Sequence, residues 1–144
     1  MRDRIFFDTS ILVYAFTIDE PKKHEKCKEL VKKAFNGMIK GVVSNQVLSE
    51  LFFVLTRKKG IEEQKAEIIV NSLILSDNWE KINYTHETVE KAKKLAIELN
   101  LSFWDALIAA TLSENNIDKI YTENEKDFKK LKWLKVKNPL AQSS

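Results

Sequence analysis

The sequence predicts an α/β protein with a mainly parallel sheet covered by helices on both faces. Three observations indicate this class. Short apolar runs alternate with longer segments of helical periodicity along the chain. No linker, repeat or low-complexity tract interrupts the alternation, and 144 residues suit one domain with a substantial core. We therefore expect a single domain over residues 1–140, followed by a loose tail at 141–144.

The first part of the chain predicts two strands, each followed by helices. Residues 4–8 (RIFFD) form a short buried strand, and a brief helix follows at 11–16. A longer helix covers 22–36, because a proline precedes it, apolar residues recur at helical spacing and a glycine follows. The next strand, 41–44 (GVVS), leads into a strongly apolar helix at 45–58.

The rest of the chain continues the alternation. Helices are expected at 62–76, 86–99, 101–116 and 124–131. Strands are expected at 79–84, 119–122 and 134–138, the last at an edge of the sheet. In the helix at 62–76, the residues predicted to point inward are Ile68, Ile69, Leu73 and Ile74.

The composition excludes several kinds of site. The three glycines lie too far apart for a phosphate-binding loop, so a P-loop and a Rossmann fingerprint are absent from the sequence. No G-x-S-x-G motif exists for a serine hydrolase. His24 and His86 have no histidine or cysteine at ligand spacing, which argues against a tetrahedral zinc site. Any chemistry must therefore use carboxylates, hydroxyls or amides.

The totals also bear on compartment and partners. No segment approaches the ~20 apolar residues of a membrane span. A strand-like run begins almost at once, without a signal peptide, and Cys27 is the single cysteine, so we expect a cytoplasmic protein. The net charge of +3 is compatible with a nucleic-acid partner without requiring one.

Three carboxylates stand in apolar surroundings: Asp8 in IFFDTSIL, Glu50 in VLSELFFVL and Asp105 in FWDALIAA. An isolated ionised carboxylate in such surroundings costs several kcal/mol unless something pairs with it. Asp105 is the most telling, because its same-face neighbours on a helix are all apolar.

Each of the three also has a purely structural interpretation. Asp8 fits an Asx turn or the N-cap of the following helix. Residues 102–105 fit the S-x-x-D variant of a capping box. Glu50 fits a polar strip of its helix that faces solvent. A cap, however, accounts for only one carboxylate at a time.

Position in the fold favours a shared site. In parallel sheets, functional sites lie where strands end and helices begin. Asp8 follows the first strand, Ser44 ends the second and Thr122 ends a late one. If the carboxylates converge there, their repulsion raises at least one pKa, and a hard divalent cation removes the conflict. An all-oxygen ligand set without histidine or cysteine favours Mg²⁺ or Mn²⁺.

Four motifs together resemble PIN-domain proteins of the VapC type, the ribonuclease toxins of type II toxin–antitoxin systems. They are FDTSILVYAF, VVSNQVLSEL, LSFWDALIAATL and IYTENEKDF, in this order along nearly the whole chain. The first is similar to the D-[TS]-[SN]-x-[LI] opening of the family, and the second keeps its hydroxyl-to-glutamate spacing.

The resemblance assigns the acidic positions. Asp8, Glu50 and Asp105 match the first three acidic positions of the family, and Asp127 is favoured for the fourth. The alternatives for the fourth position are Asn124 and Glu123. As a hypothesis, Asp8 and Asp105 bind a metal directly, while Glu50 and Asp127 hold metal-bound waters or a second ion.

The resemblance also implies a three-layer α/β/α fold with about five strands. The implied activity is divalent-metal-dependent cleavage of RNA, with Mg²⁺ or Mn²⁺ as the cofactor, usually in a homodimer held by an antitoxin. Two alternatives stay open. One is an RNA-processing nuclease outside a toxin–antitoxin pair, and the other is a catalytically silent PIN-like module that binds RNA or protein. An aspartate-nucleophile phosphatase is disfavoured, because its D-x-D motif would need an acid at Ser10.

Supporting residues are predicted around the carboxylates. The hydroxyls of Ser10, Ser44 and Thr122 are expected to orient them, with Asn124 as a polar companion of Asp127; ordinary turn residues are the alternative.

Two further groups of side chains bear on RNA binding. Arg57, Lys58 and Lys59 are the best candidates for RNA contact, although most lysine runs are simply solvated. Trp104 is either a base-stacking side chain or, as an apolar helix favours, part of the core.

Overall fold

The structure is a computed structural model, and it describes residues 3–141. It contains one sheet of five strands, all parallel, in the order β3-β2-β1-β4-β5. The strands are β1 (Arg4–Phe7), β2 (Lys40–Ser44), β3 (Trp79–Ile82), β4 (Lys119–Tyr121) and β5 (Lys135–Lys137). The prediction of a parallel sheet of about five strands, with the last strand at its edge, is confirmed.

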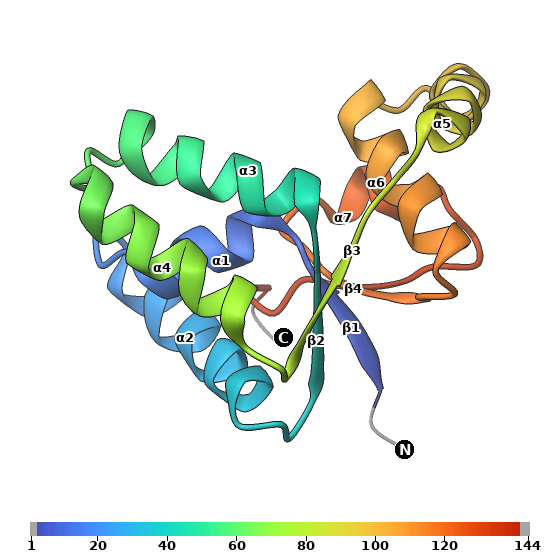
Figure 1. The fold of residues 1–144 in the computed structure, drawn as a ribbon. Helices are drawn as coiled ribbons and strands as arrows, with labels where there is room; N and C mark the ends of the chain where they lie inside the picture. Colours follow the sequence, from blue (N-terminus) through green and yellow to red (C-terminus); the bar gives the residue numbers. More distant parts are fainter. Residues whose placement is uncertain (1–2, 142–144) are drawn as a thin grey trace.

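Helices cover both faces of this sheet. Figure 1 shows α1 to α4 on one side of the strands and α5 to α7 on the other, so the three-layer α/β/α prediction is confirmed. The α-helices are α1 (Thr9–Phe16), α2 (Pro21–Phe35), α3 (Asn45–Phe53), α4 (Glu63–Leu75), α5 (His86–Leu99), α6 (Phe103–Glu114) and α7 (Glu125–Phe128). A π-helical turn, η1 (Val54–Lys58), continues α3.

The strand order defines where a site can lie. The chain leaves β1 toward β2 on one side, while β4 pairs with β1 on the other side. The carboxyl ends of β1 and β4 therefore flank the topological switch point, which is where open parallel sheets bind their ligands. The residues directly after these two strands are Asp8 and Thr122.

The core fixes β1 rigidly in the centre. Phe6 and Phe7 are both fully buried, and consecutive strand residues point to opposite faces of the sheet. On the α2 side, the Phe7 ring meets the Trp79 ring edge-on with 4.9 Å between centroids, and Phe35 of α2 packs against the same indole. The other face is covered by α6, whose residues from Ala106 to Leu112 are all buried.

Two predictions about helices are wrong in detail. The helix expected over 45–58 is α-helical only to Phe53 and continues as the π-helical turn η1. In α4, Ile68 and Ile74 are 68% and 43% exposed, whereas Ala66 and Leu73 are buried. Apolar residues lie on more than one face of this helix, so periodicity alone does not say which face packs inward.

No helix among residues 3–141 is long and apolar enough to cross a membrane. The loose tail expected at 141–144 lies, apart from Ala141, outside the described residues.

Candidate active site

Asp8 is at once a helix cap and the centre of a polar network. Its backbone N–H donates to the Tyr121 carbonyl at 3.0 Å, which extends the β1–β4 pairing by one residue. Its carboxylate accepts a hydrogen bond from the N–H of Thr9 at 2.9 Å, as an N-cap of α1 does. The second carboxylate oxygen accepts a 2.7 Å bond from the Thr122 hydroxyl. Asp8 is therefore held by three hydrogen bonds, one through its own backbone N–H and one at each carboxylate oxygen, and has little freedom to turn.

Glu50 reaches the same edge of the sheet from α3. One carboxylate oxygen accepts a 3.0 Å bond from the Thr9 hydroxyl, and the other accepts a 2.9 Å bond from the Gln46 side-chain amide. Thr9 thus donates to Asp8 through its N–H and to Glu50 through its hydroxyl. Glu50 is half-buried and belongs to the network, so it is not a residue of a solvated helix face.

Asp105 joins the network from the first turn of α6. The Ser102 hydroxyl caps this helix by accepting a 3.2 Å bond from the Asp105 N–H, so the predicted cap is present. The Asn124 amide donates to Asp105 at 2.9 Å and to Asp127 at 3.2 Å. The Asn124 backbone N–H also donates to the Thr122 hydroxyl at 3.0 Å. Asp8 and Asp105 are therefore connected through Thr122 and Asn124.

The charges of these carboxylates act on one another. Burial raises the pKa of Asp8 to about 6, against the hydrogen bonds from Thr122 and Thr9, and the charges of Asp105 and Glu50 add to the rise. Burial likewise raises the pKa of Asp105; the hydrogen bond with Ser102 opposes this, and the charges of Asp127 and Glu50 reinforce it. The sequence predicted that convergence of the carboxylates raises at least one pKa; here the neighbouring charges contribute to the rise at Asp8 and Asp105, and burial is its first cause.

The partners of the network are almost all neutral. Elsewhere, acidic side chains pair with cations: Glu80 with Arg4, Glu123 with Lys23, and Asp19 with Lys59. Among residues 3–141, no lysine or arginine forms an ion pair with Asp8, Glu50 or Asp105. Only Asp127 has a cation nearby, with Lys130 Nζ at 3.5 Å. The centre of the cluster therefore carries negative charge without a basic partner.

The candidates for the late acidic position separate in space. Glu123 accepts hydrogen bonds from the Tyr14 hydroxyl at 3.0 Å and from Lys23 at 3.1 Å, so its charge is directed toward α1 and α2. Asn124 and Asp127 instead bond to each other and, through Asn124, to Asp105.

The predicted hydroxyls have different roles. Thr122 bonds to Asp8 as expected. Ser44 caps α3 by accepting a 3.1 Å bond from the Val47 N–H and makes no bond to a carboxylate. Ser10 Oγ is buried without a partner among the described residues. The residue Ser10 is among those that line a cavity of about 270 Å³, together with Thr9 and Lys58.

Two residues near the carboxylates were not predicted as part of the site, and a third was predicted to be either a base-stacking or a core residue. Thr9 follows Asp8 directly, and Gln46 precedes Glu50 by one helical turn, a spacing that is visible in the sequence. Trp104 was expected in the core but is 60% exposed. Its backbone carbonyl accepts a 3.4 Å bond from the Gln46 amide, which joins the starts of α3 and α6.

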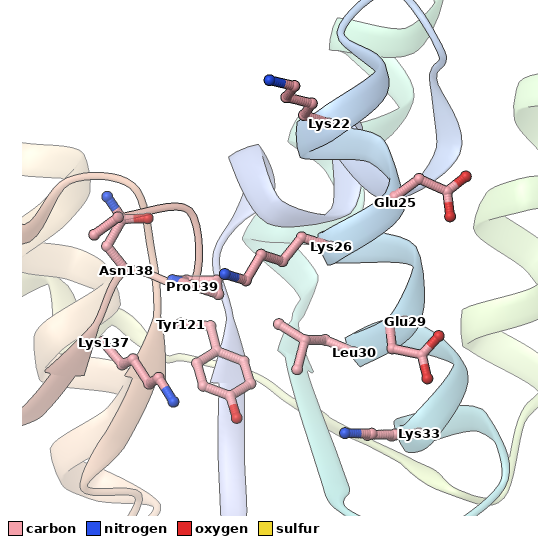
Figure 2. Close-up of a pocket in the computed structure, with 11 residues that line it drawn as sticks. Lys22, Glu25, Lys26, Glu29, Leu30, Lys33, Tyr121, Lys137, Asn138 and Pro139 are labelled. Carbon is pink, nitrogen blue, oxygen red and sulfur yellow. The ribbon is translucent and has the colours of Figure 1, made fainter. Parts of the chain in front are cut away.

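The carboxylates do not line a sizeable cavity on another part of the described chain. That cavity, about 780 Å³, lies between α2 and the segment that follows β5, with Tyr121 of β4 between them. Figure 2 shows Tyr121 and Leu30 at its centre, with the side chains of Lys26, Lys33 and Lys137 around them. A second cavity, about 460 Å³, adjoins the carboxylates, because Glu50, Gln46 and Trp104 are among its lining residues.

The donor atoms fit a hard divalent cation by their chemistry. The candidate ligands are carboxylate and amide oxygens, which Mg²⁺ and Mn²⁺ prefer. Residues 3–141 contain no group of three or more histidine, cysteine, aspartate or glutamate side chains that is already arranged to coordinate a metal ion. The unbalanced charge and the raised pKa of Asp8 are the observations that suit a cation.

Comparisons with known proteins bear on the family and the fold. The family model for the PIN domain matches residues 5–134. A comparison with curated proteins finds no match. Among solved structures, VapC20 of Mycobacterium tuberculosis, described as a sarcin–ricin loop-cleaving toxin, is 22% identical with a TM-score of 0.69, covering 87% of this chain and 93% of its own.

Two further solved structures share the fold. A toxin–antitoxin complex from Klebsiella pneumoniae is 23% identical with a TM-score of 0.67, covering 94% of this chain and 97% of its own. VapBC2 from Rickettsia felis, bound to a DNA fragment of its promoter, is 21% identical with a TM-score of 0.68, covering 94% and 98%. At these identities the likeness is one of fold.

Proposed function

The chain belongs to the PIN domain family, and from this premise we propose that it is a divalent-metal-dependent endoribonuclease that acts as the toxin of a toxin–antitoxin pair. One observation carries the proposal. Asp8, Glu50 and Asp105 come from three separate elements at the switch point of the sheet, are connected by hydrogen bonds through Thr9, Thr122 and Asn124, and have no basic ion-pair partner among the described residues. The negative charges of neighbouring carboxylates disfavour one another's ionised form, and a bound cation would remove that repulsion.

We assign the metal ligands by the position of each carboxylate in the hydrogen-bond network. Asp8 and Asp105 would hold Mg²⁺ or Mn²⁺ directly, because they are the two carboxylates joined through Thr122 and Asn124 at the centre of the network. Glu50, joined to Asp8 through Thr9, and Asp127, joined to Asp105 through Asn124, would hold water molecules of the cation or a second ion. When bound, the cation lowers the pKa of a water molecule and offsets negative charge on the phosphate.

The surrounding residues fix the carboxylates before RNA arrives. Thr9 donates hydrogen bonds to both Asp8 and Glu50 and so fixes the position of one carboxylate relative to the other. Thr122 fixes the second oxygen of Asp8. Asn124 does the same for Asp105 and Asp127. Hydrogen bonds to ligating carboxylates set their orientation, and weakening them lowers metal affinity or activity. Asn124 therefore acts as a positioning residue, while Asp127 is our choice for the fourth acid.

A basic side chain shares a cavity with Thr9 and Ser10. Lys58 and these two residues are among those that line the cavity of about 270 Å³ described above. Thr9 connects this cavity to Glu50. We propose that Lys58 and the exposed Arg57 beside it contact RNA phosphates, whereas Lys59 already pairs with Asp19 at 2.8 Å.

We also propose that the chain acts in the cytoplasm, as a homodimer that binds a cognate antitoxin. The support is that the neighbours from Klebsiella and Rickettsia are toxin–antitoxin assemblies of the same fold. Co-purification with the product of an adjacent small gene, followed by mass measurement in solution, tests both the partner and the dimer.

The test of the activity uses Asp8→Asn and Asp105→Asn, with Asp77→Asn, an exposed turn residue, as the matched control. Wild type and control should cleave RNA with Mg²⁺ or Mn²⁺ and stop in EDTA. Each site variant should lose roughly a hundredfold or more, because a metal ligand is removed.

Retained cleavage in both site variants, with unchanged circular dichroism, would contradict the assignment. RNA binding without cleavage by the wild type would instead identify a silent RNA-binding module. DNA of the same sequence serves as a second substrate and reports selectivity for RNA.

A further inference from the structure

An aromatic-walled cavity adjoins the carboxylate cluster and has no assigned role. It measures about 460 Å³ and is lined by Gln46, Ser49, Glu50, Tyr84 and Trp104. Glu50 belongs to both the cavity and the cluster. A molecule in this cavity therefore lies next to the groups proposed to act on a phosphodiester bond.

Trp104 is exposed in a way that packing does not explain. Its side chain is 60% accessible, although it stands in the first turn of a helix whose later turns are buried. Its ring contacts Phe103 edge-on with 5.5 Å between centroids. The backbone of Trp104 is nevertheless fixed, because its carbonyl accepts the hydrogen bond from Gln46. The result is a large aromatic surface held in place beside Asp105.

The cavity combines two aromatic rings with a polar edge. Tyr84, which follows β3, is half-buried and packs its body against the cluster around α5 and α6. At the polar edge, both partners of the Gln46 amide nitrogen are acceptors, namely Glu50 and the Trp104 carbonyl. These two bonds orient the amide so that its oxygen points away from Glu50 and the Trp104 carbonyl. The oxygen can then accept a hydrogen bond from an N–H group of a ligand.

Few ligands have this combination of a flat apolar face and hydrogen-bonding edges, and a nucleobase is the one that belongs to an RNA substrate. Bases stack on aromatic side chains when they are unpaired, and such stacking tolerates any base because each has a π-face. In duplex RNA the faces are covered by neighbouring base pairs. An exposed tryptophan beside the reacting groups therefore suits single-stranded RNA.

We propose that the cavity binds one unpaired base of the RNA substrate, stacked on Trp104, next to the phosphodiester bond that is cut. The inference rests on the proposed nuclease function and narrows its substrate to RNA with an unpaired nucleotide at the cleavage site. Trp104 and Tyr84 bind the base, and Gln46 both positions Glu50 and meets the edge of the base.

The chain provides a matched control for exposure. Trp133 is 43% exposed and lines a different cavity, with Ser113, Asn116, Ile117 and Asp118, that has no second aromatic residue. Replacing Trp133 removes a comparable exposed ring without touching the carboxylate cluster.

Binding is measured in an Asp8→Asn background in the presence of Mg²⁺, so that the RNA stays intact. The probes are six-nucleotide single-stranded RNAs, a series with one abasic position each, and a blunt RNA duplex. We expect Trp104→Ala to weaken single-strand binding about tenfold, since one stacked base contributes roughly that factor. Trp104→Phe should recover most of the loss, Trp133→Ala should change nothing, and the duplex should bind weakly to all.

The abasic series separates stacking from a structural effect. With Trp104 present, one probe position should weaken binding when its base is removed. In Trp104→Ala this position dependence should disappear. Equal affinities for the Trp104→Ala variant and its parent, or the same abasic profile in both, would overturn the proposal.

A second measurement keeps this proposal distinct from the nuclease proposal. With the otherwise wild-type protein, Trp104→Ala should raise KM for single-stranded RNA while kcat changes less than about threefold. If the wild type cleaves no RNA but the abasic profile depends on Trp104, the nuclease proposal fails and the base site stands. If the wild type cleaves RNA and Trp104→Ala alters neither KM nor the profile, only the base site fails.

Discussion

Asp8 shows how one side chain combines a structural and a chemical role. As an N-cap it satisfies a backbone donor of α1, which typically stabilises a helix by about 1 kcal/mol. As a buried carboxylate its pKa is raised to about 6, which corresponds to a cost of about 3 kcal/mol for the ionised form. The cost exceeds the benefit of the cap at neutral pH, so the cap alone does not explain an aspartate at this position.

The raised pKa gives a prediction with a definite sign. In the unfolded chain Asp8 ionises near its ordinary value of 3.8, and in the folded protein near 6. Between about pH 4 and 6 the folded state holds the proton more tightly, so stability falls as pH rises through this range and the full penalty applies above it. Asp8→Asn should therefore stabilise the metal-free protein at pH 7.5 by about 1 to 3 kcal/mol.

Urea denaturation in EDTA at pH 5, 6 and 7.5 measures this effect. The stability difference between Asp8→Asn and wild type should grow with pH, while Asp77→Asn should follow the wild type throughout. A less stable Asp8→Asn protein at pH 7.5 would show that the Asp8 carboxylate is not strained in the metal-free fold.

Trp104 marks the limit of what single residues reveal in a sequence. Three carboxylates in apolar runs could be found by inspection, because buried charge is rare and conspicuous. An exposed tryptophan in an apolar helix has no such signal, because a buried tryptophan has the same kind of neighbours in the sequence. Only the placement of α6 against its neighbours decides that Trp104 is outside and Ala106 inside.

At the scale of elements, the boundary between α3 and η1 is the clearest difference from the sequence prediction. The N–H of Lys59 donates to the Val54 carbonyl at 3.0 Å, which is the wider spacing of a π-turn. Neither glycine nor proline lies in residues 45–58 to signal the change. The wider turn contains Arg57 and Lys58 and changes the directions in which its side chains point, and π-turns of this kind recur at functional sites.

At Gly41 of β2, the neighbouring elements β3 and α2 leave no room for a side chain. A Cβ atom there would lie 2.6 Å from two atoms of the Trp79 ring and 2.9 Å from the Ala34 Cβ. Contacts this short force β2, β3 and α2 apart. Gly41→Ala should therefore destabilise the protein by about 1 to 3 kcal/mol through overpacking.

Thermal and urea unfolding test this expectation, with Ser113→Ala on the exposed part of α6 as the control. Shortening the facing ring in Gly41→Ala/Trp79→Leu should recover part of the loss, giving a favourable coupling between the two sites. Additive losses would mean that the indole does not oppose the new methyl group.

At the scale of the whole molecule, the alternation of strands and helices explains which residues could be predicted to lie near one another. It does not explain the contacts that these residues make. Alternation of strands and helices implies a parallel sheet, and a parallel sheet implies that strand ends share one edge. That reasoning placed Asp8 and Thr122 together correctly. It could not show that Thr9 bridges two carboxylates or that Glu123 turns toward Lys23, because such contacts depend on packing between helices.

The cluster should also couple metal binding to global stability. Only the folded chain gathers these carboxylates, so a cation that binds them must raise the melting temperature by linkage. We expect millimolar Mn²⁺ to raise the Tm of the wild type by several degrees, at a size set by the ratio of metal concentration to Kd.

Differential scanning calorimetry with Mn²⁺ and then excess EDTA measures the shift and its reversal. Asp105→Asn should show a much smaller shift, and Asp77→Asn the full one. An unchanged Tm in the wild type would remove the physical basis for a metal at this edge of the sheet.

The 2.7 Å bond between Thr122 and Asp8 joins residues 114 positions apart, and this separation orders events during synthesis. A ribosome adds about 5 to 20 residues per second, so the first carboxylate exists many seconds before its hydroxyl partner. Until β4 has been made, β1 lacks one of its two neighbours in the sheet and Asp8 lacks the Thr122 hydroxyl. A nascent chain without β4 therefore cannot assemble the carboxylate cluster, however long the residues before β4 have been folding.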